Sequence, residues 1–428
     1  MPLVGHTLRV LVLLALRNLR RHVRRTLLTA CAMILGGVLL MFSLAVGDGT
    51  HEQWIESGVR MGSGHVTIEA PEYRRGRKIE DRLPAAVRAD VEAALAAPGI
   101  RERVVASSAR LLIGGLASSP AGARPAQIVA VDPVAEAAFN VLDDQPVEGR
   151  YLEPGDRLAA FVGQGLMESL DLRLGSRLVL TAQDANKDIA AQLVRVVGVF
   201  RSGVPEIDQS LVHVPLRMAG EWLATGDDVV NVGVLVAKSD DVPGLVRDLR
   251  RALAGPVADG TAVVLGWREA MPELDAAVTI DDLGNYIVYG ILFSIIALGI
   301  VNTMLMAVMY RHREFGVLQA LGLTPAQSGL VALVEGLVLT SVSGVIGIAL
   351  GIGITWYFWG DGLDFSAMYS GEMTFSGVLL DPVIVPLFRT ARLVQVFVFV
   401  FLLGTLASLY PAFRAARIDV TEAMKFDR

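Results

Sequence analysis

The chain has very few of the residues that build metal sites and disulfide frameworks. Its 428 residues include one cysteine and six histidines. A single cysteine excludes an internal disulfide. Cys31 lies inside an apolar run, where a small packed side chain is the expected role and a reactive thiol is the alternative. The histidines are scattered, and His51-Glu52 lacks the second histidine of a zinc-binding helix motif, so we expect no metal bound by this chain.

Motifs for nucleotide binding and nucleophilic catalysis are also missing. No Gly-x-x-x-x-Gly-Lys-[Ser/Thr] sequence occurs, so the chain cannot bind ATP through a P-loop. A search for Gly-x-Ser-x-Gly finds only Gly62-Ser63-Gly64, which indicates a turn. The pair Asp281-Asp282 suggests a cation site or acid chemistry, but solvated residues beside an apolar run are the simpler interpretation. A membrane enzyme would therefore lack any candidate nucleophile or metal set.

Long stretches without charge are what the chain has in excess. Hydrophobic residues make up 53% of it, against about 45–50% in soluble domains. A helix of about 20 apolar residues crosses the ~30 Å core of a bilayer. Four stretches are long enough, the third interrupted only by Glu335: 26–47, 283–310, 326–358 and 393–413. We predict four membrane spans; a cleaved signal peptide ending near residue 47 is the alternative for the first.

Arginines beside these runs predict their orientation, because such residues concentrate on the cytoplasmic side. They precede the first run and follow the second and fourth, whereas Arg389 and Arg392 depart from the rule. Both termini, with a tail at 414–428, and a loop at 311–325 are then cytoplasmic, whereas 48–282 and 359–392 lie outside. Residues 1–25, apolar with an arginine-rich edge, predict an interfacial amphipathic helix.

The outer segment 48–282 predicts a mixed α+β domain with a core of its own. Alternating patterns indicate strands at 65–69, 126–131, 177–181, 192–200 and 262–265. Helices are expected at 84–97 and 241–254. Residues 183–188 form the polar tip of an expected hairpin, and 267–282 should lead into the second span as one continuous helix.

Several residues within the apolar runs are candidates for special roles. Glu335 is an acid in an apolar context, which costs about 3 kcal/mol if it is unpaired. We expect it to pair with a basic residue of the first helix or with backbone donors, with proton coupling as the alternative. Ser343, Gly347 and Gly351 recur every four residues and would let another helix approach closely. The aromatic residues of the second run would form an interfacial belt or the rim of a lipid-facing cavity.

The run 302–325, NTMLMAVMYRHREFGVLQALGLTP, resembles the FtsX-like, MacB-type permeases, the type VII ABC transporters. Residues 410–424, YPAFRAARIDVTEAM, and ALRNL at 15–19 extend the resemblance. Motifs of the outer segment are similar to the lipoprotein-releasing (Lol) branch. They lie at 131–133, 149–152, 163–166, 170–175 and 197–208.

The resemblance implies a non-catalytic inner-membrane permease subunit, with its large domain in the periplasm. It would pair with a second permease subunit, identical or not, and recruit separate ABC ATPase subunits that bind ATP and Mg. The implied ATPase-coupling residues are Arg313, Glu314, Phe315, Gly316, Val317, Leu318, Ala320, Leu321 and Gly322. In the Lol branch the first two spans line an opening for acyl chains. The matching candidates for a substrate cavity are Met33, Leu40, Tyr286, Tyr289 and Phe293.

Three functions remain open. The first is ATP-driven extraction or movement of lipoproteins, by mechanotransmission from the cytoplasmic helix to the outer domain. A periplasmic carrier could assist, although the hairpin at 183–190 that would grip it is short and has no proline. The second is MacB-like export with a periplasmic adaptor. The third is transmembrane signalling that regulates a cell-wall hydrolase. Nucleic-acid binding is not expected.

Overall fold

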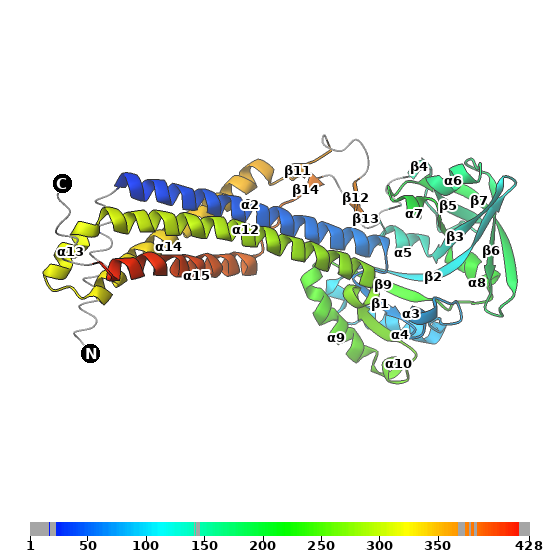
Figure 1. Ribbon diagram of the computed structural model, residues 1–428. Coiled ribbons are helices and arrows are strands. Elements are labelled where there is room, and N and C mark those ends of the chain that lie inside the picture. Colours follow the sequence, from blue (N-terminus) through cyan, green and yellow to red (C-terminus); the bar gives the residue numbers. More distant parts are fainter. Residues whose placement is uncertain are drawn as a thin grey trace. The chain divides into compact units, whose positions relative to one another are not determined.

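The computed structural model describes residues 17, 23–140, 142, 146–366, 373–375, 378–380 and 383–418 (Figure 1). They divide into two compact units. The helical unit contains the residues up to His51, Ile280–Phe365 and those from Val383 onward. The sheet unit contains Glu52–Thr279 and Ser366–Pro382. Most of the predicted interfacial helix at 1–25 and most of the tail at 414–428 lie outside the described residues.

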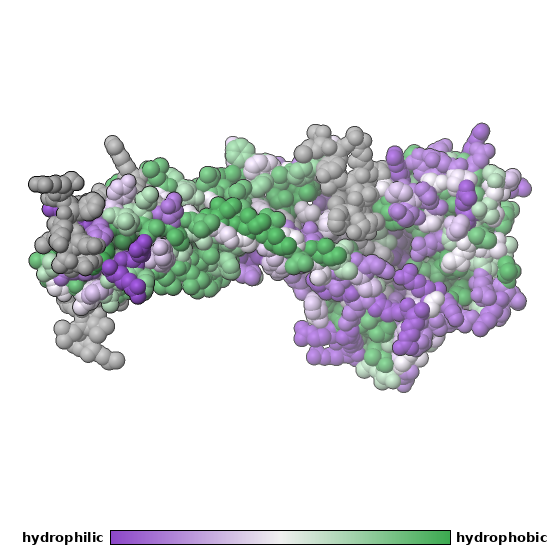
Figure 2. Space-filling model, in the orientation of Figure 1, coloured by the Kyte–Doolittle hydropathy of each residue, from purple (hydrophilic) through white to green (hydrophobic). Residues whose placement is uncertain are grey.

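Four long helices contain the four predicted apolar runs. They are α2 (Val23–Met61), α12 (Pro272–Tyr310), α14 (Pro325–Trp359) and α15 (Thr390–Ala416). Each is long and apolar enough to cross a membrane. Hydrophobic surface covers these helices in Figure 2, as expected for side chains that face lipid. Both α2 and α12 extend past their apolar runs into the residues of the sheet unit, and α12 includes most of the predicted helical lead-in.

Short elements complete the helical unit. The helix α13 (His312–Ala320) connects α12 to α14. Between α14 and α15, β11 (Leu363–Asp364) pairs with β14 (Val383–Ile384). The strands β12 (Met373–Phe375) and β13 (Val378–Leu380) form a separate pair within residues assigned to the sheet unit.

One ten-stranded sheet organises the sheet unit, in the order β10-β1-β9-β2-β3-β8-β5-β7-β4, with β6 joined to β2 and β7. In chain order, the first five strands are β1 (Val66–Glu69), β2 (Val104–Ser119), β3 (Gly122–Val131), β4 (Pro146–Gly149) and β5 (Ala159–Gly163). The others are β6 (Arg177–Gln183), β7 (Ile189–Phe200), β8 (Leu211–Pro215), β9 (Asn231–Val236) and β10 (Val263–Gly266). The strands expected from the alternating patterns are all present.

The hydrogen-bonded order closes into a ring, because β6 pairs with both β2 and β7 while β3, β8 and β5 complete the circuit. The long strand β2 joins the ring to the strands outside it, because its beginning pairs with β9 and its end pairs with β6. Gly115 makes this possible, since a Cβ there would lie 2.5 Å from the carbonyl oxygen of Thr181. Inward side chains such as Ile128, Val162 and Val194 fill the ring as a hydrophobic core.

Helices cover β10, β1 and β9, which lie outside the closed ring. The helices α4 (Ala85–Ala96) and α9 (Val242–Ala252) place Val91, Leu245 and Leu249 in one core with β1, β9 and β10. Pro84 precedes α4 and Pro243 lies in the first turn of α9, where a missing backbone N–H does no harm. The smaller helices are α3 (Tyr73–Gly76), α5 (Pro133–Ala137), α6 (Gln164–Ser169), α7 (Pro205–Asp208), α8 (Leu216–Trp222), α10 (Ala254–Ala258) and α11 (Trp267–Ala270). Single 3₁₀ turns occupy Arg101–Arg103 and Ser239–Asp241.

Candidate functional site

The turn between α13 and α14 is set by local sequence. Gly322 has φ +103°, and its N–H donates to the carbonyl of Gln319 while Leu323 N–H donates to that of Leu318. Together these bonds form a Schellman motif, which ends a helix by satisfying its last carbonyls. Thr324 then caps α14 through a capping box with Gln327, and Pro325 opens the helix. The chain therefore reverses direction within very few residues.

An arginine ties α13 to the start of α14. The Arg311 guanidinium donates to Glu314 (Nε–Oε2 2.9 Å) and to Glu335 (Nη1–Oε2 2.8 Å). Both Arg311 and Glu335 are buried, so each compensates the charge of the other where solvation is weak. Glu335 is thus paired as expected, but its partner follows the second span; the expectation of a partner in the first helix was wrong.

The residues implied in ATPase coupling divide between the two faces of α13. Phe315 and Gly316 are buried, and the Phe315 ring packs against Val308, Ala332 and Ala415. Leu318 and Glu314 are half-buried. The exposed members are Arg313, Val317, Ala320, Leu321 and Gly322. The exposed members are the most accessible to a partner protein, whereas Phe315 anchors the helix.

Small residues bring α14 close to its neighbours. A Cβ on Gly347 would lie 3.1 Å from the Ile34 carbonyl oxygen and 3.3 Å from Gly37 Cα of α2. A Cβ on Gly351 would lie 2.7 Å from Met41 Cβ. Ser343 is buried, and among the described residues its hydroxyl has no hydrogen-bond partner. The two glycines therefore contact α2 of the same chain, as interface residues of apolar helices do.

The candidates for a substrate cavity lie at different depths. Leu40 is 1% exposed and packs with Met41, Leu44 and Val396, and Tyr289 and Phe293 cover this cluster. Met33 packs beside Ile300. Tyr286 is exposed on the surface of the helical unit. A pocket that Met33 and Leu40 line holds about 20 Å³.

An ion pair joins Asp48 of α2 to the first turn of α15. Arg392 donates to Asp48 (Nη2–Oδ1 3.0 Å), and Asp48 is buried. This pairing gives a physical reason for an arginine that departs from the expected charge distribution. Nearby, His51 Nδ1 lies 3.8 Å from Asp282 Oδ1, and the Asn285 amide donates to Asp281.

A second buried ion pair lies in the sheet unit. Arg110 on β2 holds Glu136 on α5 with two hydrogen bonds of 2.8 and 2.6 Å, and Ser108 adds a third at 2.6 Å. Burial acts to raise the pKa of Glu136, but Arg110 outweighs it and keeps that pKa below its ordinary value. Burial lowers the pKa of His213 to about 4, so its ring is neutral at neutral pH. The Tyr151 hydroxyl lies 3.1 Å from His213 Nδ1.

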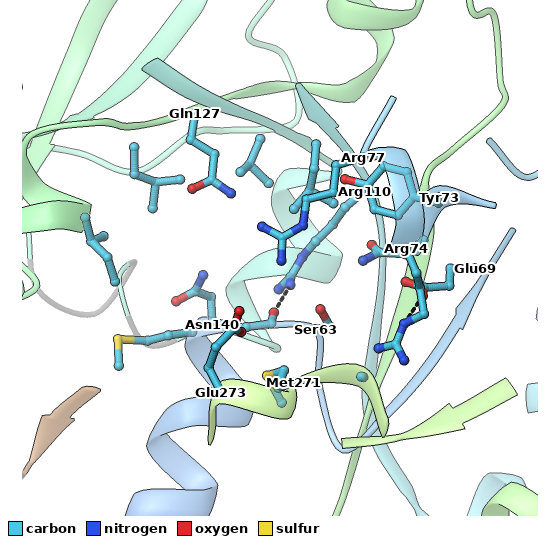
Figure 3. A pocket seen from close by; sticks show the side chains of 18 of the residues that line it. Ser63, Glu69, Tyr73, Arg74, Arg77, Arg110, Gln127, Asn140, Met271 and Glu273 are labelled. Atoms are coloured by element: carbon cyan, nitrogen blue, oxygen red, sulfur yellow. Dashed lines mark hydrogen bonds and ion pairs between the residues drawn. The ribbon is translucent and has the colours of Figure 1, made fainter. Parts of the chain in front are cut away.

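Arg110, Glu136 and His213 border a pocket of about 480 Å³ (Figure 3). Its lining combines strand residues with the end of α2, the α3 helix and the start of α12. Tyr73, Arg74 and Arg77 come from α3 and the residue that caps it. Burial raises the pKa of Glu69, which Arg74 contacts at 3.0 Å, and raises that of Tyr73 to about 12. No local motif in the sequence indicates this pocket.

Among the residues that the structure describes, no group of three or more His, Cys, Asp or Glu side chains could hold a metal ion. Cys31 is exposed on α2 rather than packed, so the expectation of a core role for it was wrong.

Comparison with known proteins gives two family matches that together span most of the chain. Residues 26–252 match the MacB-like periplasmic core domain, and residues 286–420 match the FtsX-like permease C-terminal domain. An uncharacterized ABC transporter permease of Bacillus subtilis, YknZ, is 23% identical over 97% of this chain and 98% of its own. The lipoprotein-releasing system transmembrane protein LolC of Xylella fastidiosa is 24% identical over the same shares. The macrolide export ATP-binding/permease protein MacB of Brucella melitensis is 24% identical over 80% of this chain but 52% of its own length.

Proposed function

Because this chain belongs to the ABC transporter permeases of the FtsX and MacB type, we propose that it extracts or moves lipoproteins from the inner membrane, driven by a separate ATPase. In this proposal both termini and α13 lie in the cytoplasm and the sheet unit lies in the periplasm. ATP hydrolysis on the partner moves α13, and α12 and α2 carry the motion to the sheet unit.

The way α13 packs on the helical unit is the observation that carries this proposal. One face of the helix is fixed to the helical unit by Phe315 and by the Arg311–Glu335 ion pair. The other side presents Arg313 together with apolar side chains, of which Val317 is 41% and Leu321 80% exposed. A helix that is anchored on one side and exposes apolar side chains on the other suits a partner that pushes on it. The missing P-loop supports a separate ATPase chain.

The alignment to LolC, over 98% of that protein, supports lipoprotein movement as the first candidate. Export with a periplasmic adaptor is the second candidate, and the match to the MacB-like periplasmic core domain favours it. A second permease subunit completes either assembly.

The test uses the complex that copurifies with the full chain, reconstituted in vesicles that carry a fluorescent acylated lipoprotein. We expect ATP-dependent release of the lipoprotein from the vesicles. Leu321→Glu should lower release at least tenfold while the protein still inserts, because a charge on the apolar face must be desolvated at the partner contact. Leu321→Met, which keeps an apolar side chain, should retain release.

Three results would contradict parts of the proposal. ATP hydrolysis without lipoprotein release would rule out this substrate, and an ATPase activity of the isolated chain would rule out the separate motor. Equal release by Leu321→Glu and Leu321→Met would show that α13 is not the coupling surface.

A further inference from the structure

Three polar side chains form a row across the floor of the sheet-unit pocket. Glu69 on β1 stands opposite Asn231 on β9, and Asn231 stands opposite Arg110 on β2. Directly paired residues project from the same face of a sheet. The exposed fractions are 5% for Glu69, 2% for Asn231 and 4% for Arg110. A buried row of this kind is unfavourable unless its members find partners.

Glu69 and Arg110 have partners and Asn231 lacks one. Arg74 contacts Glu69, and Glu136 contacts Arg110. Among the described residues, nothing donates a hydrogen bond to the Asn231 side-chain oxygen, although that atom is buried. A buried acceptor left in this state favours a ligand that brings a donor.

Two exposed charges also line the pocket, the Arg77 guanidinium and the Glu273 carboxylate, and among the described residues neither forms an ion pair. Burial raises the pKa of Glu69, and the Arg77 charge opposes that rise together with Arg74. Figure 3 shows Arg77 and Glu273 on opposite sides of the pocket, with the Arg77 side chain directed into it. The pocket therefore offers one positive group, one negative group and an unfilled acceptor.

The backbone of Arg77 adds a second indication. Arg77 caps α3 with φ +47° and ψ +38°, the left-handed conformation that glycine adopts most readily. An arginine here carries backbone strain that a glycine would not. An outlier of this kind, with its side chain directed into a pocket, points to a functional role.

From these observations we propose that the pocket binds a small zwitterionic molecule, of the chemical class of an amino acid or a short peptide with free ends. Its carboxylate pairs with Arg77, its ammonium group pairs with Glu273, and a further N–H donates to Asn231. The volume of about 480 Å³ lies within the ~300–1,000 Å³ of small-molecule sites. Met61 ends α2 and Pro272 begins α12, so the ligand contacts the ends of both helices. The proposal does not depend on lipoprotein movement.

The test measures binding of alanyl-alanine to the purified full-length chain by calorimetry and by thermal unfolding. The same dipeptide with an acetylated amino end and an amidated carboxyl end serves as a probe without charges. We expect saturable binding of the free dipeptide, and at least tenfold weaker binding of the blocked one, because each charge-assisted hydrogen bond is worth about a factor of ten or more.

Variants separate binding from folding. Arg77→Gly should weaken dipeptide binding at least tenfold and raise the melting temperature of the free protein, because glycine relieves the left-handed strain. Glu273→Gln should weaken binding of the free dipeptide and leave that of the blocked one unchanged. Arg75→Ala is the matched control, since Arg75 lies on the same helix, pairs with Glu72 and does not line the pocket.

Two outcomes would overturn the proposal. One is an affinity for the blocked dipeptide equal to that for the free one, or no saturable binding of either at millimolar concentrations. The other is Arg77→Gly binding as tightly as the Arg75→Ala control. Inorganic phosphate, included as an anion that lacks an ammonium group, should compete poorly; competition equal to that of the dipeptide would also overturn the zwitterion assignment.

Discussion

Burial and neighbouring side chains set the charge states of single residues in the sheet unit. His213 is 2% exposed, and its burial outweighs the favourable charge of Glu136, so protonation of its ring is unfavourable in the folded state. Glu136 is as deeply buried but keeps its charge, because Arg110 and Ser108 donate hydrogen bonds to it. Of these two buried groups, His213 is thus neutral at neutral pH and Glu136 is charged.

This difference predicts a pH dependence of stability. The pKa of His213 falls from an ordinary 6.5 to about 4 on folding, so between these values the unfolded chain binds a proton that the folded chain does not. Stability should then fall as the pH drops from 6.5 to 4, by about 1.4 kcal/mol per unit, or roughly 3 kcal/mol in total. Glu136, whose pKa is lowered, adds a loss only below its ordinary value of 4.5.

Pulse proteolysis in urea over this pH range would measure the slope for the full chain. The His213→Phe variant, whose ring fits beside Phe161 and Phe200 and cannot titrate, should lose most of the slope between pH 6.5 and 4. The comparison rests on slopes, since the variant also loses the contact with Tyr151. Parallel slopes for the two proteins would contradict the assignment.

At the scale of elements, the contact between α14 and α2 depends on glycine. A methyl group on Gly347 would meet the backbone of α2 at Ile34 and Gly37, which cannot move aside as a side chain can. Gly353, on the same helix, is exposed with open space around it. The two positions form a matched pair for one substitution.

We expect Gly347→Ala to destabilise the helical unit by about 1–3 kcal/mol, the usual range for overpacking. Gly353→Ala should be neutral or slightly stabilising, because alanine favours a helix more than glycine does. Thermal unfolding of the detergent-purified chain would measure both. Equal melting temperatures for the two variants would show that α14 and α2 are not packed through Gly347.

Much of the element pattern could be predicted from the sequence, where the signal is local. Charge-free length predicts the long helices, and Gly322 with Thr324 and Pro325 marks the turn after α13. The strand β2 could not be predicted in this way, because Gly114-Gly115 in its middle is typical of a turn. The reason for glycine at position 115 becomes clear only in the structure, where β6 approaches Gly115 too closely for a side chain.

The sites were harder to predict because they combine distant residues. The pairing of Glu335 with Arg311 depends on the reversal at α13, and the pocket row joins Glu69, Arg110 and Asn231 from three separate strands. No spacing in the chain encodes such a register. Phe315 illustrates the same limit within one helix, since the sequence groups it with the exposed residues of α13 although it is buried.

At the scale of the whole molecule, the proposed transport requires α2 and α12 to separate, since Leu40, Tyr289 and Phe293 fill the space that an acyl chain would occupy. A disulfide between them should therefore stop transport. A Cβ on Gly36 would lie 3.1 Å from Ile296 Cγ1, so cysteines at these two positions can meet. The exposed Cys31 must first be replaced by serine.

We expect oxidised Gly36→Cys/Ile296→Cys protein to lose lipoprotein release, to keep its bound ATPase, and to recover release on reduction. Cysteines at Gly344 and Val400 link α14 to α15, where a Cβ on Gly344 would lie 3.6 Å from Val400 Cγ1. This control pair should leave release unchanged. Release that continues with the α2–α12 disulfide in place would show that the two helices need not part.

The pairing of β1 with β10 has a mechanical consequence. The strand β1 follows α2 and β10 leads to α12, and the two are antiparallel with Val66 opposite Gly266. Trp267 N–H donates to the His65 carbonyl beyond that pair. The connections to α2 and α12 therefore leave the β1–β10 pair at the same end. A force that spreads the two strands breaks their backbone hydrogen bonds one after another, whereas a force that slides one strand along the other loads all of these bonds together. The pair is thus stiff to a pull along the strands and compliant to a pull that separates them.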